Sequence, residues 1–166
     1  MNVHEGRVWT FGDDVDTDLI VPGRFLILEP SEIAQHVMAG IRPGFAELVE
    51  EGDILVAGEN FGSGSSREVA PRALREVGIV AVVAKSFSRI FFRNSVNLGL
   101  APVVCPDAGV IEEGQSIRID FDLGEVLIIE TGKRLAAGVL PSEVAAIMEA
   151  GGMVEFLRTR LSESQL

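Results

Sequence analysis

The stretch GENFGSGSSREVAPRALREVG, residues 58–78, is the part of the chain on which both the fold and the function depend. A glycine- and serine-rich turn leads here into Ser65, Ser66 and Arg67 and then into a helical pattern. Three structures are compatible with this order of residues: a flexible linker, a helix start capped by hydroxyl groups, or a binding site for a small anion.

Predicted strands on either side of this stretch argue against the linker. Residues 53–57 are a short apolar run bounded by glycines, and residues 79–84 are apolar and β-branched, as expected of a central strand covered on both faces. Helical patterns over residues 67–77 and 86–94 alternate with these runs, and a further buried strand is expected over residues 100–105. The alternation predicts βαβ units around a parallel sheet.

The remainder of the chain predicts additions to that sheet. Residues 116–121 and 125–130 flank an acidic turn, and residues 131–139 can add a third strand, which together indicate an antiparallel or barrel-like portion. We also expect a strand over residues 6–11 and helices over residues 30–38, 141–149 and 154–161. The whole chain, residues 1–166, is expected to form one α/β domain.

Composition excludes several classes of function. The net charge of −11 argues against general nucleic-acid binding, and the longest apolar run is far shorter than the roughly 20 residues of a membrane span. Cys105 is the only cysteine, so the chain cannot form an internal disulfide or assemble a thiolate metal site of its own. The first residues lack the order of a signal peptide, and we therefore expect a cytoplasmic protein that holds no metal itself.

The serine turn itself allows a structural and a functional interpretation. Ser65 and Glu68 have the spacing of a capping box, although Pro71 fits better near the first position of a helix that starts later. Amides at a helix start, two serine hydroxyls and the Arg67 guanidinium would equally suit a carboxylate. Between Ser65 and Arg93 the chain has six basic and two acidic residues, a local excess of positive charge that favours the anion site.

Four stretches taken together resemble a known family. They are DVDTDLIVP at 14–22, NFGSGSSRE at 60–68, APRAL at 70–74 and SRIFFRNSVNLG at 88–99. In this order and spacing they are similar to the swivel domain of the aconitase superfamily and, within it, to the small subunits of 3-isopropylmalate dehydratase (isopropylmalate isomerase). The resemblance covers nearly the whole chain and implies a swivelling β/β/α layered fold.

The resemblance also implies that the chain is half of an enzyme. In the family a separate large subunit carries a [4Fe-4S] cluster on its own cysteines, and the cluster iron acts as a Lewis acid on the substrate hydroxyl. The reaction removes water from a small hydroxy-dicarboxylate and adds it back in another position. The implied function is therefore a hydro-lyase of leucine biosynthesis that is active only as a heterodimer with the large subunit.

Individual residues acquire roles through the same resemblance. Ser65 matches the serine that moves the proton on the carbon next to a carboxylate. Ser66 matches a residue beside the substrate and the cluster, Arg67 a ligand of the substrate carboxylate, and Asp18 an acidic active-site residue. Asn94 is expected instead to be structural and to bond loop backbone ahead of the strand at 100–105.

In the family the loop after the Thr-Asp motif contacts the variable group of the substrate. Here that loop contains Arg24, Phe25, Leu26, Ile27 and Leu28. The apolar run suits an isopropyl group, which ranks isopropylmalate first. Homoaconitate or citrate-type substrates, which would need a cation within the run, rank second because Arg24 lies just before it, and dimethylmalate-type substrates rank third. The same residues would also be explained by core packing.

Val69 departs from the family pattern, which often has His or Gln at this position. Valine cannot form a side-chain hydrogen bond, so the departure leaves the exact substrate open. It also leaves open a different class of function, in which the chain is a non-catalytic carboxylate-binding module of the same fold.

Overall fold

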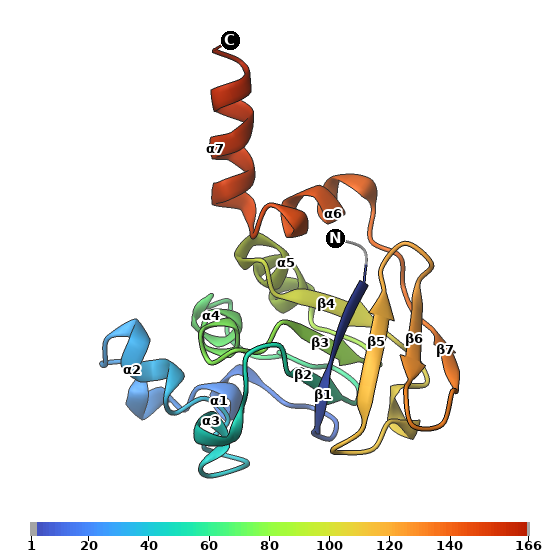
Figure 1. The fold of residues 1–166 in the computed structure, drawn as a ribbon. Helices are drawn as coiled ribbons and strands as arrows, with labels where there is room; N and C mark the ends of the chain where they lie inside the picture. The colour runs from blue at the N-terminus through green and yellow to red at the C-terminus, as the bar shows by residue number, and fades with distance from the viewer. Residues whose placement is uncertain (1–2, 166) are drawn as a thin grey trace.

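The computed structural model describes residues 3–165, which build one seven-stranded sheet in the order β4-β3-β2-β1-β5-β6-β7 (Figure 1). The strands are β1 Val3–Thr10, β2 Ile54–Ala57, β3 Ala81–Ala84, β4 Ala101–Val104, β5 Ser116–Asp120, β6 Glu125–Ile128 and β7 Arg134–Ala136. The helices are α1 Thr17–Ile20, α2 Pro30–Ala34, α3 Phe45–Leu48, α4 Val69–Glu76, α5 Arg89–Leu98, α6 Ser142–Glu149 and α7 Met153–Glu163, with short 3-10 turns η1 Gly23–Phe25 and η2 Ala108–Val110.

The strands β2 to β4 are parallel, as the alternating pattern over residues 53–105 predicted, and β1 joins them in parallel through its pairing with β2. The four residues of β2 are all buried and point alternately to opposite faces of the sheet. Leu55 and Ala57 belong to an apolar cluster on the helical face, whereas Ile54 and Val56 belong to a second cluster on the other face. β3 behaves in the same way, with Val82 and Ala84 in the first cluster and Ala81 and Val83 in the second, which confirms the prediction that residues 79–84 form a central strand covered on both faces.

The antiparallel part continues the same sheet beyond β1. β5 pairs with β1, and β6 and β7 follow as an antiparallel meander that continues the sheet beyond β5 (Figure 1). Side chains such as Ile117, Ile119 and Val126 fill the second cluster together with residues of β2 and β3. The result is a layer of helices, a layer of parallel strands and a layer of antiparallel strands, which confirms the expected layered α/β class.

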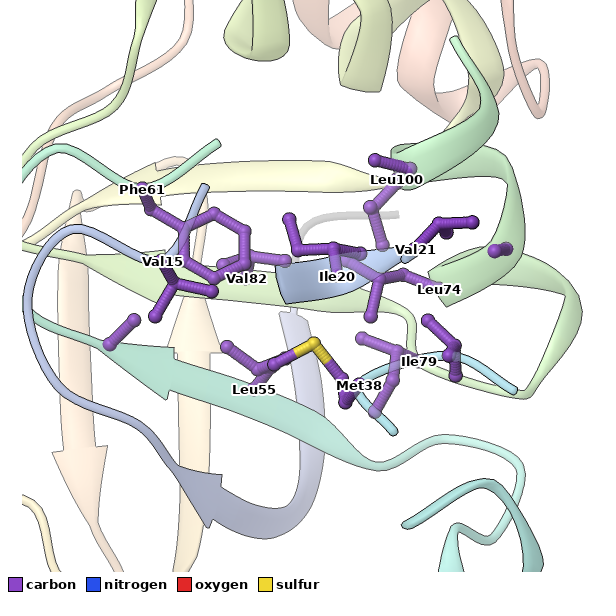
Figure 2. Close-up of a cluster of buried hydrophobic side chains, with 14 of the residues drawn as sticks. Val15, Ile20, Val21, Met38, Leu55, Phe61, Leu74, Ile79, Val82 and Leu100 are labelled. Carbon is purple, nitrogen blue, oxygen red and sulfur yellow. The ribbon is translucent and has the colours of Figure 1, made fainter. Parts of the chain in front are cut away.

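A cluster of buried apolar side chains packs the helices and loops against one face of the sheet (Figure 2). Residues of the loops that lead to the site belong to this cluster. Ile20 comes from α1, Leu74 from α4, and Leu55 and Val82 from the sheet, and Phe61 comes from the loop after β2. Each fully buried side chain of this size contributes about 1.5–3 kcal/mol to folding. The loops after β1 and β2 are therefore attached to the core rather than free.

Some element boundaries differ from those predicted. The helix expected over residues 30–38 ends at Ala34 and continues as turns, and the short helices α1 and α3 were not predicted. The strand expected over residues 6–11 begins earlier, because it pairs with β5 from Val3 onward. No helix within residues 3–165 has the length and apolar character needed to cross a membrane.

Candidate active site

Three loops meet at one edge of the sheet because β1, β2 and β3 run in parallel and end on the same side. The backbone N–H of Asp14 donates to the carbonyl of Glu59 at 2.8 Å, and that of Gly62 donates to Val15 at 2.7 Å. Phe61 N–H donates to the carbonyl of Ser86 at 3.0 Å. The serine turn after β2 is thereby tied to the loop after β1 on one side and to the loop after β3 on the other.

Gly62 starts the turn in a conformation that other residues rarely adopt, with φ of 80°. A Cβ added at this position would lie 2.1 Å from Cγ of Phe91, so only glycine fits against α5. The Ser88 hydroxyl donates to the Gly62 carbonyl at 2.8 Å and accepts from Phe91 N–H at 3.3 Å, which caps α5. One serine thus joins the turn to the start of the helix.

Ser65 is half-buried and bonded on two sides. Its hydroxyl oxygen accepts from the backbone N–H of Arg67 at 3.2 Å, and its own N–H donates to the Thr17 hydroxyl at 3.0 Å. The capping box that this spacing allowed does not form, because Glu68 is the N-cap of α4 and makes no side-chain capping bond; the later helix start that Pro71 favoured is confirmed, since α4 begins at Val69. Pro71 falls in the first turn of α4, where its missing N–H removes no intrahelical bond.

Ser66 and Arg67 are exposed at the tip of the turn. The Ser66 carbonyl accepts from the side-chain amide of Asn94 at 3.1 Å, so Asn94 supports this turn rather than the loop before β4, where we expected it. The Arg67 guanidinium forms no ion pair or hydrogen bond with any residue between 3 and 165. The turn therefore presents two serines and one open cation on a supported backbone.

Asp18 lies in α1, which touches the serine turn through its first residue, Thr17. The Asp16 side chain caps this helix by accepting from Leu19 N–H at 2.8 Å. Asp18 itself is exposed, and its carboxylate has no hydrogen-bonding partner in the described part of the chain. The structure thus places Asp18 beside the turn that carries Ser65, Ser66 and Arg67, with its carboxylate open to solvent.

The predicted specificity loop divides into residues that pack and one that projects. Leu26 and Leu28 pack against the cluster on the helical face. The Phe25 ring stacks on His36 with centroids 4.1 Å apart, and the Arg24 guanidinium lies over the same ring at 4.5 Å. Ile27 is 90% exposed. Arg24 and Ile27 therefore sit differently, the first against an aromatic ring and the second free at the tip.

Val69 begins α4 and packs, half-buried, against the cluster on the helical face. It also lines a cleft of about 250 Å³ between α2 and α4, together with Ile33 and Arg72. Its visible role is packing between the specificity-loop region and the helix that follows the serine turn. This is a role that an apolar side chain fills without any hydrogen bond.

An iron-sulfur cluster held by this chain would need several converging ligand side chains. Within residues 3–165, no three His, Cys, Asp or Glu side chains converge as metal ligands would. Cys105 is buried, and burial raises the pKa of its thiol, which disfavours the thiolate needed for metal binding. The residues present thus do not fit a cluster held by this chain.

Comparison with known proteins gives the context for this geometry. Residues 44–108 match the family described as Aconitase C-terminal domain. The chain is 52% identical to the 3-isopropylmalate dehydratase small subunit 1 of Methanopyrus kandleri, with 95% of this chain and 94% of the relative covered. The chain belongs to the family of 3-isopropylmalate dehydratase small subunits. This confirms the resemblance seen in the four sequence stretches and the hydro-lyase class that it implied.

Two further comparisons extend this result. The chain is 44% identical to the isopropylmalate/citramalate isomerase small subunit of Methanocaldococcus jannaschii, with 99% of each covered. A crystal structure of 3-isopropylmalate dehydratase from the same organism superposes with a TM-score of 0.92 at 45% identity over 98% of both chains. Aconitase X of Thermococcus kodakaraensis shares the fold, with a TM-score of 0.55 at 21% identity over 76% of this chain and 89% of the other.

Sequence reasoning did not find Thr17 and Ser88, the two hydroxyl residues that hold the turn in place. Ser88 had a readable signal, since a serine directly before a helical pattern is a frequent N-cap. Thr17 had a weaker one, its place within the Asp-Thr-Asp motif, because a contact across 48 residues leaves no local pattern.

Proposed function

We propose that the chain, acting as one swivel-like domain, is half of a cytoplasmic two-chain [4Fe-4S] hydro-lyase of leucine biosynthesis. The enzyme interconverts 2-isopropylmalate and 3-isopropylmalate by dehydration and rehydration, and its large subunit carries the cluster. The observation that supports this most directly is the Ser65-Ser66-Arg67 turn, which is rigidly backed yet open in front. The similar proteins reported above, which are named 3-isopropylmalate dehydratase small subunits, also support the proposal.

Ser65 is the proposed proton carrier. The C–H bond on the carbon next to a carboxylate breaks, its proton passes to the Ser65 alkoxide oxygen, and the electron pair forms a double bond as hydroxide leaves the adjacent carbon. The cluster, when bound on the large subunit, would supply the Lewis acid that takes up this hydroxide. In rehydration Ser65 returns the proton as a hydroxyl is added. A serine alkoxide needs stabilisation, and the Arg67 N–H that already donates to Ser65 Oγ at 3.2 Å supplies part of it, with the guanidinium nearby in the chain.

Arg67, Ser66 and Asp18 are the proposed substrate-binding residues. An unpaired guanidinium can hold a carboxylate through two parallel hydrogen bonds, which fixes its orientation as well as its position. The exposed Ser66 hydroxyl adds a donor next to it in the chain, and the exposed Asp18 carboxylate orients bound groups. In a chain of net charge −11, the positive segment around this turn gives a carboxylate substrate a local attraction.

The substrate side chain is proposed to meet Ile27 in the assembled enzyme. Ile27 projects from its loop, whereas the only cation of the loop, Arg24, is engaged with the Phe25 ring. An apolar tip favours an alkyl branch over an additional carboxylate, which supports isopropylmalate against homoaconitate-type substrates. A methyl branch would meet the same surface, and the relative named isopropylmalate/citramalate isomerase makes citramalate the second candidate.

The test is an anaerobic assay of this chain mixed with the cluster-loaded large subunit encoded in the same genome. The unsaturated intermediate is followed by absorbance with 3-isopropylmalate, citramalate and homocitrate in parallel, and each chain alone is the control. We expect activity only from the mixture and highest kcat/KM with 3-isopropylmalate. If the mixture had no activity on any of the three acids despite an intact cluster, the proposal would be contradicted and the carboxylate-binding module favoured.

A further inference from the structure

Thr17 is a polar residue in an apolar setting, only 6% exposed at the start of α1. Its backbone N–H donates to the Ser63 carbonyl at 2.8 Å, and its hydroxyl oxygen accepts from Ser65 N–H at 3.0 Å. Gly64 lies between these two bonds with φ of 102°, and a Cβ added there would come within 3.2 Å of the Thr17 hydroxyl. Thr17 therefore bonds the serine turn on both sides of Gly64, at Ser63 and at Ser65.

We infer that Thr17 is the positioning residue for Ser65. The inference rests on the function proposed above, because it assigns Thr17 an effect on the reaction through the serine that carries the proton. The bond to Ser65 N–H fixes the backbone of that residue, and the backbone in turn sets where its hydroxyl meets the Arg67 N–H. A positional error of about 1 Å in such a group can lower the rate about 100-fold.

The hold of Thr17 on the turn is rigid because Thr17 is itself held from several directions. Asp16 caps α1, and the Thr17 carbonyl accepts from Val21 N–H at 2.9 Å. Ile20, in the same helix, is fully buried in the cluster on the helical face. A group placed on an anchored element positions its partner more accurately than one on a free loop.

The other two residues that hold the turn act on its neighbouring residues. Ser88 bonds the Gly62 carbonyl and Asn94 bonds the Ser66 carbonyl, on either side of Ser65. Among residues 3–165, Thr17 provides the side chain that bonds the backbone of Ser65. Loss of Thr17 should therefore move Ser65 while the ends of the turn stay in place.

The first test is kinetic and uses the reconstituted two-chain enzyme. Thr17→Val keeps the shape and removes the acceptor, and we expect kcat to fall about 10- to 100-fold with KM changed less than about threefold. Thr17→Ser restores an acceptor and should recover kcat to within about threefold of the wild-type enzyme. Should the valine variant not fold, Thr17→Ala takes its place.

A double-mutant cycle separates positioning from a general structural effect. In a Ser65→Ala background, Thr17→Val should leave the residual kcat unchanged, because there is no longer a hydroxyl to position. Equal losses from Thr17→Val in both backgrounds would overturn the inference. A wild-type mixture that is inactive, or a Ser65→Ala variant as active as wild type, would instead contradict the proposed function.

A second readout does not depend on activity. In the ¹⁵N-labelled full chain, exchange of the Ser65 amide with solvent should become at least about tenfold faster in Thr17→Val and stay near wild type in Thr17→Ser. The thermal midpoint, measured in parallel, reports any loss of global stability. Unchanged exchange in the valine variant would show that the bond does not hold Ser65 and would overturn the inference even if kcat fell.

Discussion

The two ends of the parallel strand β2 treat charge in opposite ways. Just before the strand, the buried Asp53 carboxylate accepts from Arg7 at 2.8 Å, from the Trp9 indole at 2.8 Å and from Glu50 N–H at 2.9 Å. Beyond its other end, the Arg67 guanidinium is exposed and has no partner among residues 3–165. The first charge has its partners within the fold, whereas the second has none there and is the one that the proposed function assigns to a substrate carboxylate.

The pKa of Asp53 reflects the hydrogen bonds that its carboxylate accepts. Burial alone would raise the pKa of this carboxyl, but the hydrogen bonds from Arg7, Trp9 and the Glu50 amide outweigh burial and hold the pKa below its usual range. The same bond to Asp53 raises the pKa of Arg7. This pair therefore stays ionised across the physiological range and acts as a structural link between β1 and β2.

The largest effect that we expect is on kcat, from a substitution in the serine turn that follows β2. Ser65→Ala should lower kcat about 10²- to 10⁴-fold, the range typical of a lost acid–base group, because alanine cannot carry a proton. The thermal midpoint should hardly move, since the hydroxyl accepts only one bond, from Arg67 N–H. Initial rates of the reconstituted enzyme and a melting curve check both parts, and an unchanged kcat would remove Ser65 from the reaction.

The second effect comes from Asp53, just before β2, and should appear in stability rather than in rate. Asp53→Asn keeps the shape but removes the charge that three donors share, which should lower the free energy of unfolding by about 2 kcal/mol. The matched control is Glu5→Gln, since the pair of Glu5 with Arg118 is exposed and should matter little. Urea unfolding measures both, and a kcat that fell with stability intact would contradict the division between the two ends.

The Asp53 contribution should also depend on pH in one direction. Because its folded pKa is depressed, the stabilisation is fully present above the unfolded value of about 3.9 and is lost as the pH falls through the folded pKa. The difference in unfolding free energy between wild type and Asp53→Asn should therefore shrink below about pH 4. A difference that stayed constant down to pH 2 would show that the charge of Asp53 is not what stabilises the fold.

A third change weakens the open charge without removing it. Arg67→Lys keeps the positive charge but loses the two-pronged geometry, so KM should rise about tenfold while kcat changes less. Stability should stay constant because the guanidinium has no partner to lose in the described part of the chain. Steady-state kinetics with 3-isopropylmalate provide the measurement, and wild-type KM would exclude Arg67 from substrate binding.

The fold was largely predictable because its strands carry strong local signals. The run at residues 53–57 is bounded by glycines and the run at residues 79–84 is apolar on both faces, and the structure places β2 and β3 within them. The late start of α4 at Val69 was predictable from Pro71, whereas the bond from Ser65 N–H to the hydroxyl of the distant Thr17 was not. Local spacing describes a helix start well but has no information on contacts from another loop.

In the specificity loop, too, the sequence did not predict which side chains pack and which are exposed. The run from Phe25 to Leu28 is uniformly apolar in sequence, yet in the structure Leu26 and Leu28 are partly buried against the core and Ile27 is 90% exposed. The loop contains a 3-10 turn, η1, of three residues followed by further turns, and elements this short leave no periodic pattern in the sequence. Only the folded backbone separates packing residues from the one that is free to meet a ligand.

The smallest expected effect tests that separation at Ile27. Ile27→Arg should lower kcat/KM for 3-isopropylmalate and raise it for homocitrate, shifting their ratio about tenfold, because a cation at the tip can pair with an additional carboxylate. Ile27→Gln, polar but uncharged, should lower the first value without raising the second. Stability should be unaffected in both, since the side chain packs on nothing that a larger residue would displace. Equal ratios in all three proteins would mean that substrate choice is made elsewhere, by the large subunit or by the packed residues of the loop.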